Sequence, residues 1–207
     1  MVTYKINIDT QSKSEKIITA VLLRKLIEIK DKLMYNPDWL EIKPDLKEEI
    51  KNKALFTLFK EEDNNTKKKM CDVVIQLGEN VFICKEKWPQ LIEYILECLK
   101  LNCEGNNIIQ IESGINILSG LYGHLCDLLG EFTEIIVNCF RVYFKSNEIS
   151  LKTSSIRALT EILAFSDKKT IKQYDEFIYS ILHTTLLCFE STNIKDENNV
   201  NLFIIFS

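Results

Sequence analysis

Glycine and proline are scarce in this chain, at six and three of 207 residues. Average usage is roughly 7% and 5%, so a fold of many strands and tight turns is disfavoured and long helices are favoured. No stretch reaches the ~18 consecutive apolar residues that span a bilayer. The first ten residues lack the apolar core of a signal peptide. The sequence therefore predicts a soluble, helical protein.

A basic excess and catalytic motifs are also missing. The net charge of −4 and the pI near 5.4 argue against nucleic-acid binding. The two histidines, His124 and His183, stand far apart, and no CxxC, GxSxG, P-loop or GxGxxG pattern occurs. Seven cysteines, an odd count, fall mostly on apolar helix faces and indicate a reducing compartment. We expect no enzyme activity, no metal and no cofactor.

What the chain does contain is an internal repeat. Residues 88–101, WPQLIEYILECLKL, align 41 positions later with residues 129–142, LGEFTEIIVNCFRV. Polar residues coincide at i, i+3, i+7 and i+10, which confines them to a narrow strip of a helix. Protein must cover most of the remaining surface of such a helix. The paired positions are Gln90/Glu131, Glu93/Glu134, Glu97/Asn138 and Lys100/Arg141.

The segments between these helices repeat as well. CDVVIQLGEN (71–80), ESGINILSGL (112–121) and SIRALTEILA (155–164) start 41 and then 43 residues apart. Helix pairs with a period of roughly 40–47 residues are typical of HEAT or armadillo repeats, and two helices per unit favour HEAT. We therefore expect an all-α fold, an α-α superhelix (HEAT-repeat solenoid) of about four antiparallel helix pairs.

The expected pairs cover about 12–61, 65–102, 107–146 and 148–191. Their first helices run over about 14–30, 66–80, 108–121 and 150–165, and their second helices over about 45–60, 88–102, 130–145 and 171–190. Ser12 and Glu15 are spaced as a capping box, Pro44 suits a first helical turn, and Asp167 is a plausible cap. Residues 192–207, with an apolar end, resemble the truncated start of a further repeat. We expect one array over 1–207 that is part of a longer protein.

The repeated acidic strips admit three interpretations. Paired carboxylates can act as acid and base, but these are expected on an open face, so solvation is far more common than catalysis. A surface for a basic partner and simple solvation are about equally favoured, since solenoid concave faces are the usual binding surfaces.

Two further features have simple structural explanations. The basic run Lys67–Lys69 is better explained as solvated than as a contact with a partner. Trp88 is better explained as packing across the helix entry than as an exposed hot spot.

The region from about Ala20 to Glu190 resembles the N-terminal arch of the karyopherin-beta (importin-beta) nuclear transport receptors, most nearly the importin beta-3 type. The segments that carry the resemblance are AVLLRKL (20–26), KKKMCDVVIQLGENV (67–81), WPQLIEYILECL (88–99) and SSIRALTEILAF (154–165). The Trp-Pro start of a second helix after a KK-x-C-D first helix is the most specific element.

The resemblance implies a nuclear import receptor that shuttles between cytoplasm and nucleus. Implied partners are the Ran GTPase, cargo proteins with basic signals and FG-repeat nucleoporins, without nucleic acid or membrane insertion. RanGTP would bind the concave face formed by the second helices and release cargo. The implied contact residues are Glu48, Lys51, Asn52, Gln90, Glu93, Glu97, Lys100, Glu131, Glu134, Asn138 and Arg141.

One departure bears on this expectation. The family's first repeat, which helps to anchor Ran, has no match in MVTYKINIDTQ at the start of the chain. The cargo and nucleoporin sites of such receptors lie largely in repeats that this chain lacks. The alternative function is a HEAT-repeat scaffold or regulatory subunit that binds another protein through the same acidic face.

Overall fold

The computed structural model describes residues 12–27, 37–104, 107–166, 172, 174–181 and 183, without the side chains of Leu26, Pro37, Asp38 and Glu131. Every regular element in these ranges is helical, which confirms the all-α fold class for the described part. The chain divides into two compact units, Met1–Tyr94 and Ile95–Ser207. Each unit is described by itself.

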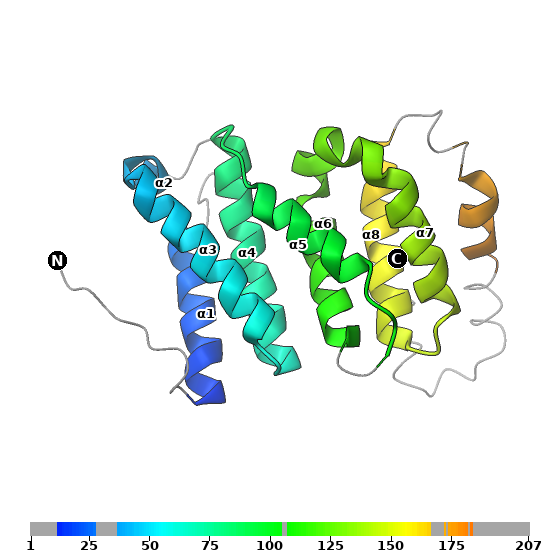
Figure 1. Ribbon diagram of the computed structural model, residues 1–207, viewed down its shortest axis with the longest axis horizontal. Helices are drawn as coiled ribbons and strands as arrows, with labels where there is room; N and C mark the ends of the chain where they lie inside the picture. Colours follow the sequence, from blue (N-terminus) through cyan, green and yellow to red (C-terminus); the bar gives the residue numbers. More distant parts are fainter. Residues whose placement is uncertain are drawn as a thin grey trace. The chain divides into compact units, whose positions relative to one another are not determined.

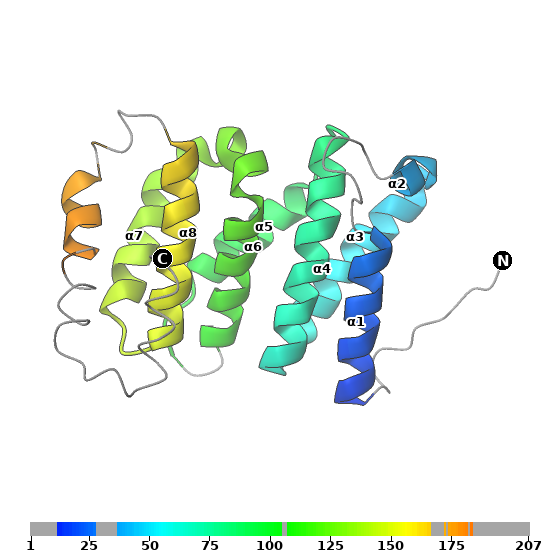
Figure 2. The same ribbon diagram turned by 180° about the vertical axis from the view of Figure 1, so that it is seen from behind.

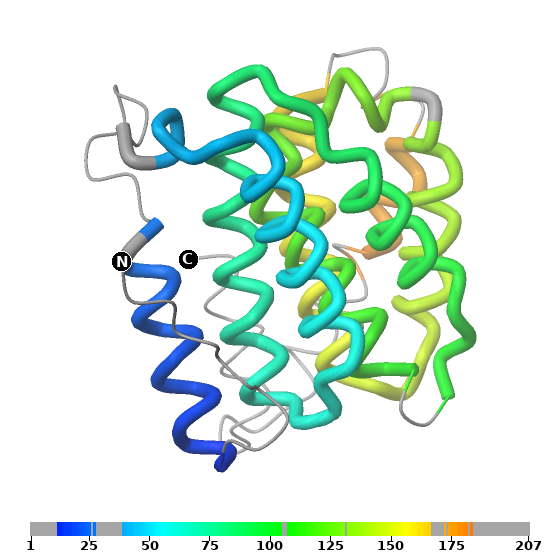
Figure 3. Tube along the Cα trace, turned by 60° about the vertical axis from the view of Figure 1, so that its left-hand side comes forward, coloured from blue at the N-terminus to red at the C-terminus, as the bar shows by residue number. Residues whose placement is uncertain are grey.

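The first unit is built around a long central helix. Its elements are α1 (Lys13–Ile27), α2 (Pro37–Glu41), α3 (Pro44–Lys60), α4 (Asn64–Ile83) and the first turns of α5 (Pro89–Leu99). Helix α4 packs against both α1 and α3, and Figure 3 shows it with one of these helices on each side. Its buried stripe includes Val74, Leu77 and Val81, each at most 1% exposed.

Helix starts in this unit follow the local capping signals. The Ser12–Glu15 capping box is confirmed, because the Ser12 N–H donates to Glu15 Oε2 at 2.7 Å and the Glu15 N–H donates to Ser12 Oγ at 3.4 Å. Pro44 opens α3 as expected. Helix α4 begins at Asn64, two residues earlier than expected, because Asp63 caps it and accepts from the Thr66 N–H at 2.9 Å.

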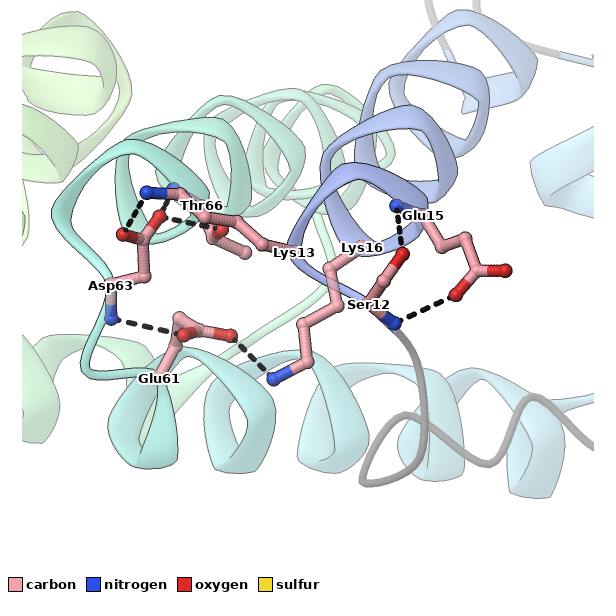
Figure 4. A network of polar contacts seen from close by, with 7 residues as sticks. All are labelled: Ser12, Lys13, Glu15, Lys16, Glu61, Asp63 and Thr66. Atoms are coloured by element: carbon pink, nitrogen blue, oxygen red, sulfur yellow. Dashed lines mark hydrogen bonds and ion pairs between the residues drawn. The ribbon is translucent and has the colours of Figure 1, made fainter.

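Ion pairs join the start of α1 to the α3–α4 turn (Figure 4). Lys13 Nζ lies 2.7 Å from Asp63 Oδ2, and Lys16 Nζ lies 3.2 Å from Glu61 Oε2. The hydrogen bond from Lys13 and that from the Thr66 N–H lower the pKa of Asp63 to about 2. Asp63 therefore serves both as the cap of α4 and as the partner of α1.

We expect acid to weaken this junction between pH 4 and pH 2. Because the folded pKa of Asp63 lies below its ordinary value of 3.8, its stabilising contribution is complete above that value and disappears as the pH falls to about 2. Asp63→Asn keeps a capping oxygen but loses the charge. Its urea midpoint should therefore be lower than that of wild type at pH values above 4 and equal to it near pH 2.

Two further variants serve as comparisons. Asp63→Ala should lower the urea midpoint more than Asp63→Asn does, whereas Glu62→Gln, next in the chain and exposed, should not change the midpoint. A constant difference between wild type and Asp63→Asn across this range would contradict the assignment.

Helix α4 ends in a left-handed turn. Lys85 has φ 56°, its N–H donates to the Phe82 carbonyl at 2.9 Å, and the Glu86 N–H donates to the Val81 carbonyl at 2.9 Å. This is the Schellman arrangement, in which glycine is the usual residue at the left-handed position. The turn directs the chain to Trp88 and the start of α5.

The second unit contains the remainder of α5, then α6 (Asn107–Leu129), η2 (Gly130–Phe132), α7 (Thr133–Lys145) and α8 (Ile149–Phe165). Helices α6 and α8 pack side by side, and α7 packs on α8, as Figures 1 and 2 show from opposite sides. Helix α6 continues eight residues past the expected end because Leu121, Leu125 and Leu129 extend its buried stripe. The expected helix from Gly130 begins instead with a 3₁₀ turn.

Helices α5 and α7 meet inside this unit through a buried hydrogen bond. The Tyr143 hydroxyl donates to the Leu99 carbonyl, and burial raises the pKa of that phenol well above its usual value. Helix α5 approaches α6 at Gly114, where an added Cβ would lie 2.5 Å from Cys98 Cβ. The expected cap at Asp167 and the expected repeat start at 192–207 lie outside the described residues.

Candidate partner-binding site

The polar strip of α5 consists of Gln90, Glu93, Glu97 and, just past the helix end, Lys100. All four residues are exposed, whereas Leu91, Ile95 and Cys98 on the other side of the helix are buried. Pro89 opens the helix as the sequence predicted, and Trp88 before it is 1% exposed. Trp88 is therefore a packing residue, which confirms the favoured interpretation over that of an exposed hot spot.

The polar strip of α7 consists of Glu131, Glu134, Asn138 and Arg141. The last three are exposed, and Ile136, Val137, Phe140 and Tyr143 form the opposite, buried face. Glu131 lies in η2, and its side chain is outside the described part. Arg141 Nη1 donates to Asn138 Oδ1 at 2.9 Å. The 41-residue repeat thus places equivalent polar residues on the exposed sides of two helices.

The expected strip of α3 differs from the structure at one residue. Glu48 and Asn52 are exposed, but Lys51 is only 3% exposed. Its ammonium group donates to the Lys87 carbonyl at 3.2 Å and pairs with the Glu48 carboxylate. The expectation that Lys51 lies open to a partner is therefore wrong. The signal was present: the apolar stripe of Ala54 and Leu58 runs back through Lys51 and Lys47, whose stems pack against protein.

Lys47 was missed by the sequence analysis. It is buried on the same side of α3, and its Nζ lies 2.7 Å from Glu86 Oε1 and 5.2 Å from the centre of the Trp39 ring. Lys47 and Lys51 together hold the loop between α4 and α5 against α3. A similar correction applies to Lys67, which was expected in solvent but is buried on α4 because it lies on the same side of the helix as the buried Met70 and Val74.

Two aromatic residues that the sequence analysis did not identify, Tyr174 and Phe177, lie beside the α7 strip. The Arg141 guanidinium stands 5.1 Å from the centre of the Phe177 ring. Tyr174 is buried nearby, and its pKa is raised by burial and by the Glu134 charge and lowered by the Arg141 charge. Tyr179, one turn further on, is 71% exposed and stacks on His183 at 6.1 Å. The spacing of Tyr174 and Phe177 at i, i+3 was the available signal.

The exposed groups suit non-covalent binding. Burial raises the pKa of the Cys84, Cys103 and Cys139 thiols, so these cysteines remain protonated at neutral pH and are poor nucleophiles. Among the described residues, no group of three or more His, Cys, Asp or Glu side chains could hold a metal ion. None of the described helices combines the length and apolarity that crossing a membrane requires. The carboxylates and amides of the strips remain as recognition groups.

Comparison with known proteins gives one family and one fold. A family model described as "IPO5-like, TPR repeats" matches residues 62–204. No curated protein matches the chain significantly. The repeat length here is longer than the roughly 34 residues of TPR units, since α4, α6 and α8 begin 43 and then 42 residues apart.

Solved structures of Kap121p have the same fold. The chain is similar to Kap121p alone with a TM-score of 0.70, and to Kap121p bound to Pho4p or to Nup53p with a TM-score of 0.69 in each case. Each match is 18% identical and covers 95% of this chain. This chain spans only 17% of the length of the Kap121p chains.

Proposed function

Because this chain belongs to the IPO5-like family, an importin-beta-type group of HEAT-repeat proteins, we propose that it is the N-terminal arch of a nuclear import receptor. In this proposal its two units are consecutive parts of one HEAT array. RanGTP binds the exposed sides of α3, α5 and α7, and its binding releases cargo. The protein acts by binding rather than catalysis and moves between cytoplasm and nucleus.

One observation carries the proposal: equivalent polar residues recur on the exposed sides of α5 and α7 in a chain of this family. In solenoids, side chains that project from successive units form extended binding surfaces. Both strips contain exposed carboxylates, Glu93 and Glu97 on α5 and Glu134 on α7. Such groups attract a partner with a basic surface and accelerate encounter at low salt.

The cargo and nucleoporin partners are supported by the structural relatives. Kap121p has been crystallised with Pho4p and with Nup53p, and its fold extends over nearly all of this chain. We propose that the longer receptor containing this arch binds cargo with basic signals and FG-repeat nucleoporins. The arch itself supplies the Ran-binding surface.

Nucleotide-dependent recovery of Ran tests the proposal. The chain is immobilised both alone and joined to the first repeat of an importin-beta-type receptor, and is offered Ran loaded with GTP or GDP. We expect the joined form to retain Ran–GTP in clear excess over Ran–GDP. Equal recovery of the two forms, or none, would contradict the import-receptor function and favour a scaffold that uses the same face for another protein.

Charge reversal identifies the face. The variant with Glu93, Glu97 and Glu134 changed to lysine should lose Ran–GTP, because each change replaces attraction for a basic partner with repulsion. Its folding should be retained, since exposed substitutions usually change stability by less than ~0.5 kcal/mol each. The control changes the exposed residues Glu41, Glu62 and Asp127 to lysine and should bind as wild type. A loss of helicity in circular dichroism in the first variant alone would show that its glutamates are structural.

A further inference from the structure

Helix α1 carries two large apolar side chains in solvent. Ile18 is 58% exposed and Leu22, one turn later, is 56% exposed. Ala20 stands between them in the sequence and is 2% exposed. Because an α-helix turns by roughly 100° per residue, Ala20 points away from both neighbours. The apolar pair therefore lies on the side of α1 opposite to its buried side.

The buried side of α1 faces α4. The two helices pack against each other and lie side by side in Figure 2. Arg24, one turn after Ala20, pairs with Asp72 of α4 at 3.6 Å between Nη1 and Oδ2. Packing on α4 thus holds α1 in place and directs Ile18 and Leu22 to solvent.

Two charged residues extend the apolar pair into a strip. Glu15, Ile18, Leu22 and Lys25 follow the spacing i, i+3, i+7, i+10, which is the a/d pattern of a coiled-coil seam. Glu15 and Lys25 are both exposed. The strip therefore has an acidic end, an apolar centre and a basic end, and these four residues are named the α1 seam.

The α1 seam is complementary to itself in one orientation. Contacts between two copies of a chain are usually two-fold symmetric. In an antiparallel pair of α1 helices, each residue before the centre of the seam lies opposite one equally far beyond it. Ile18 then meets Leu22 of the second copy, and Glu15 meets Lys25. A parallel pair would place like charges opposite each other at both ends, which disfavours it.

We propose that this chain forms an antiparallel homodimer through the α1 seam. Because α1 is already folded against α4, association does not have to order the helix first. A pair of 15-residue helices buries less than the roughly 1,200–2,000 Å² of a standard interface. The dimer is therefore weak, with a dissociation constant on the order of micromolar or higher. This inference goes beyond the proposed function and does not depend on it.

Sedimentation velocity of the whole chain tests the dimer. Wild type should change from monomer to dimer between about 5 μM and about 500 μM, the range of weak association. Leu22→Ala removes an apolar contact twice per dimer and should weaken association at least about 10-fold. Its urea midpoint should be unchanged, because leucine and alanine are both good helix formers.

Leu40→Ala is the matched control for this variant. Leu40 lies on α2 and is 52% exposed, so the same substitution is made at similar exposure outside the seam. It should associate as wild type does. A wild-type chain that is still monomeric at about 500 μM, or equal association of the two variants, would overturn the proposal.

A double-mutant cycle tests the pairing of Glu15 with Lys25. Glu15→Gln loses the charge but keeps a side-chain oxygen for the Ser12 N–H, as in a capping box. In wild type it removes attraction to Lys25 and should weaken the dimer by about 2- to 5-fold. In a Lys25→Glu background it removes repulsion and should strengthen the dimer by a similar factor. A change of the same sign in both backgrounds would contradict the antiparallel register.

The other candidate occupant of this side of α1 is a preceding helix pair in a longer chain. Successive repeats of a solenoid stack, so a repeat joined before α1 would lie on the side away from α4 and cover the α1 seam. The form joined to the first repeat of an importin-beta-type receptor should therefore be a monomer. A dimer of that form would place the contact outside the seam and overturn the assignment, whereas its recovery of Ran bears only on the proposed function.

Discussion

Truncation of Trp88 to alanine should lower the free energy of unfolding by about 3–5 kcal/mol, the range seen when large aromatic residues are removed from cores. Trp88 is among the largest fully buried side chains of the described residues. It stands between the left-handed turn at Lys85 and the first residue of α5. Its loss leaves a cavity where the chain turns into α5, so urea unfolding followed by circular dichroism should show a lower midpoint.

Trp88→Phe is the matched control because it keeps most of the aromatic volume. The Trp88 indole N–H is buried and has no hydrogen-bond partner within the described part of the chain. A buried unpaired donor costs about 1–3 kcal/mol, so its removal should offset part of the lost packing. We expect Phe to change stability by less than ~1.5 kcal/mol. Equal losses for alanine and phenylalanine would show that the indole N–H, rather than the ring volume, is what matters at this site.

Gly114→Ala should destabilise the second unit by roughly 2 kcal/mol. The added Cβ would lie 2.5 Å from Cys98 Cβ and 3.5 Å from the Ile95 carbonyl oxygen, and neither is the end of a flexible side chain. Overpacking typically costs ~1–3 kcal/mol, and more where backbone must move. The higher helix propensity of alanine relative to glycine offsets only about 1 kcal/mol of this cost. The urea midpoint measures this loss, provided that the slope of the free energy of unfolding against urea concentration is unchanged.

Two variants separate the clash from other effects of the substitution. At Gly123 the three atoms nearest to the added Cβ all belong to the Phe165 ring, the closest at 2.8 Å, and Phe165 is 55% exposed, so the end of its side chain can move aside. Gly123→Ala should therefore be neutral or stabilising by up to about 1 kcal/mol. In a Cys98→Gly background the opposing Cβ is gone, so Gly114→Ala should cost much less than in wild type. An unchanged cost there would show that the two helices do not approach as described.

The helices could be predicted from the sequence because their determinants are local. The capping box at Ser12 and the proline at position 44 act within one turn. The 41-residue repeat identified the strips of α5 and α7 because an exposed strip must be polar and its opposite face apolar. The start of α4 was placed two residues late because Asp63 was not recognised as its cap.

The candidate site was less predictable because lysine and arginine are amphipathic. Their stems can be buried while their charged ends find acceptors or rings elsewhere in the chain. The apolar stripe of Ala54 and Leu58 marks the side of α3 on which Lys51 lies, but it does not identify the acceptors that the buried ammonium group reaches. The stacking of Arg141 on Phe177 joins residues 36 positions apart, and no local rule relates them.

Periodicity alone determined the helical class and the polar strips of α5 and α7, since these follow from which side of each helix is apolar. Only the tertiary structure decided which charges of the strips remain available. A long cationic side chain goes to the nearest acceptor or aromatic face in space, and that neighbour is set by packing rather than by position in the chain.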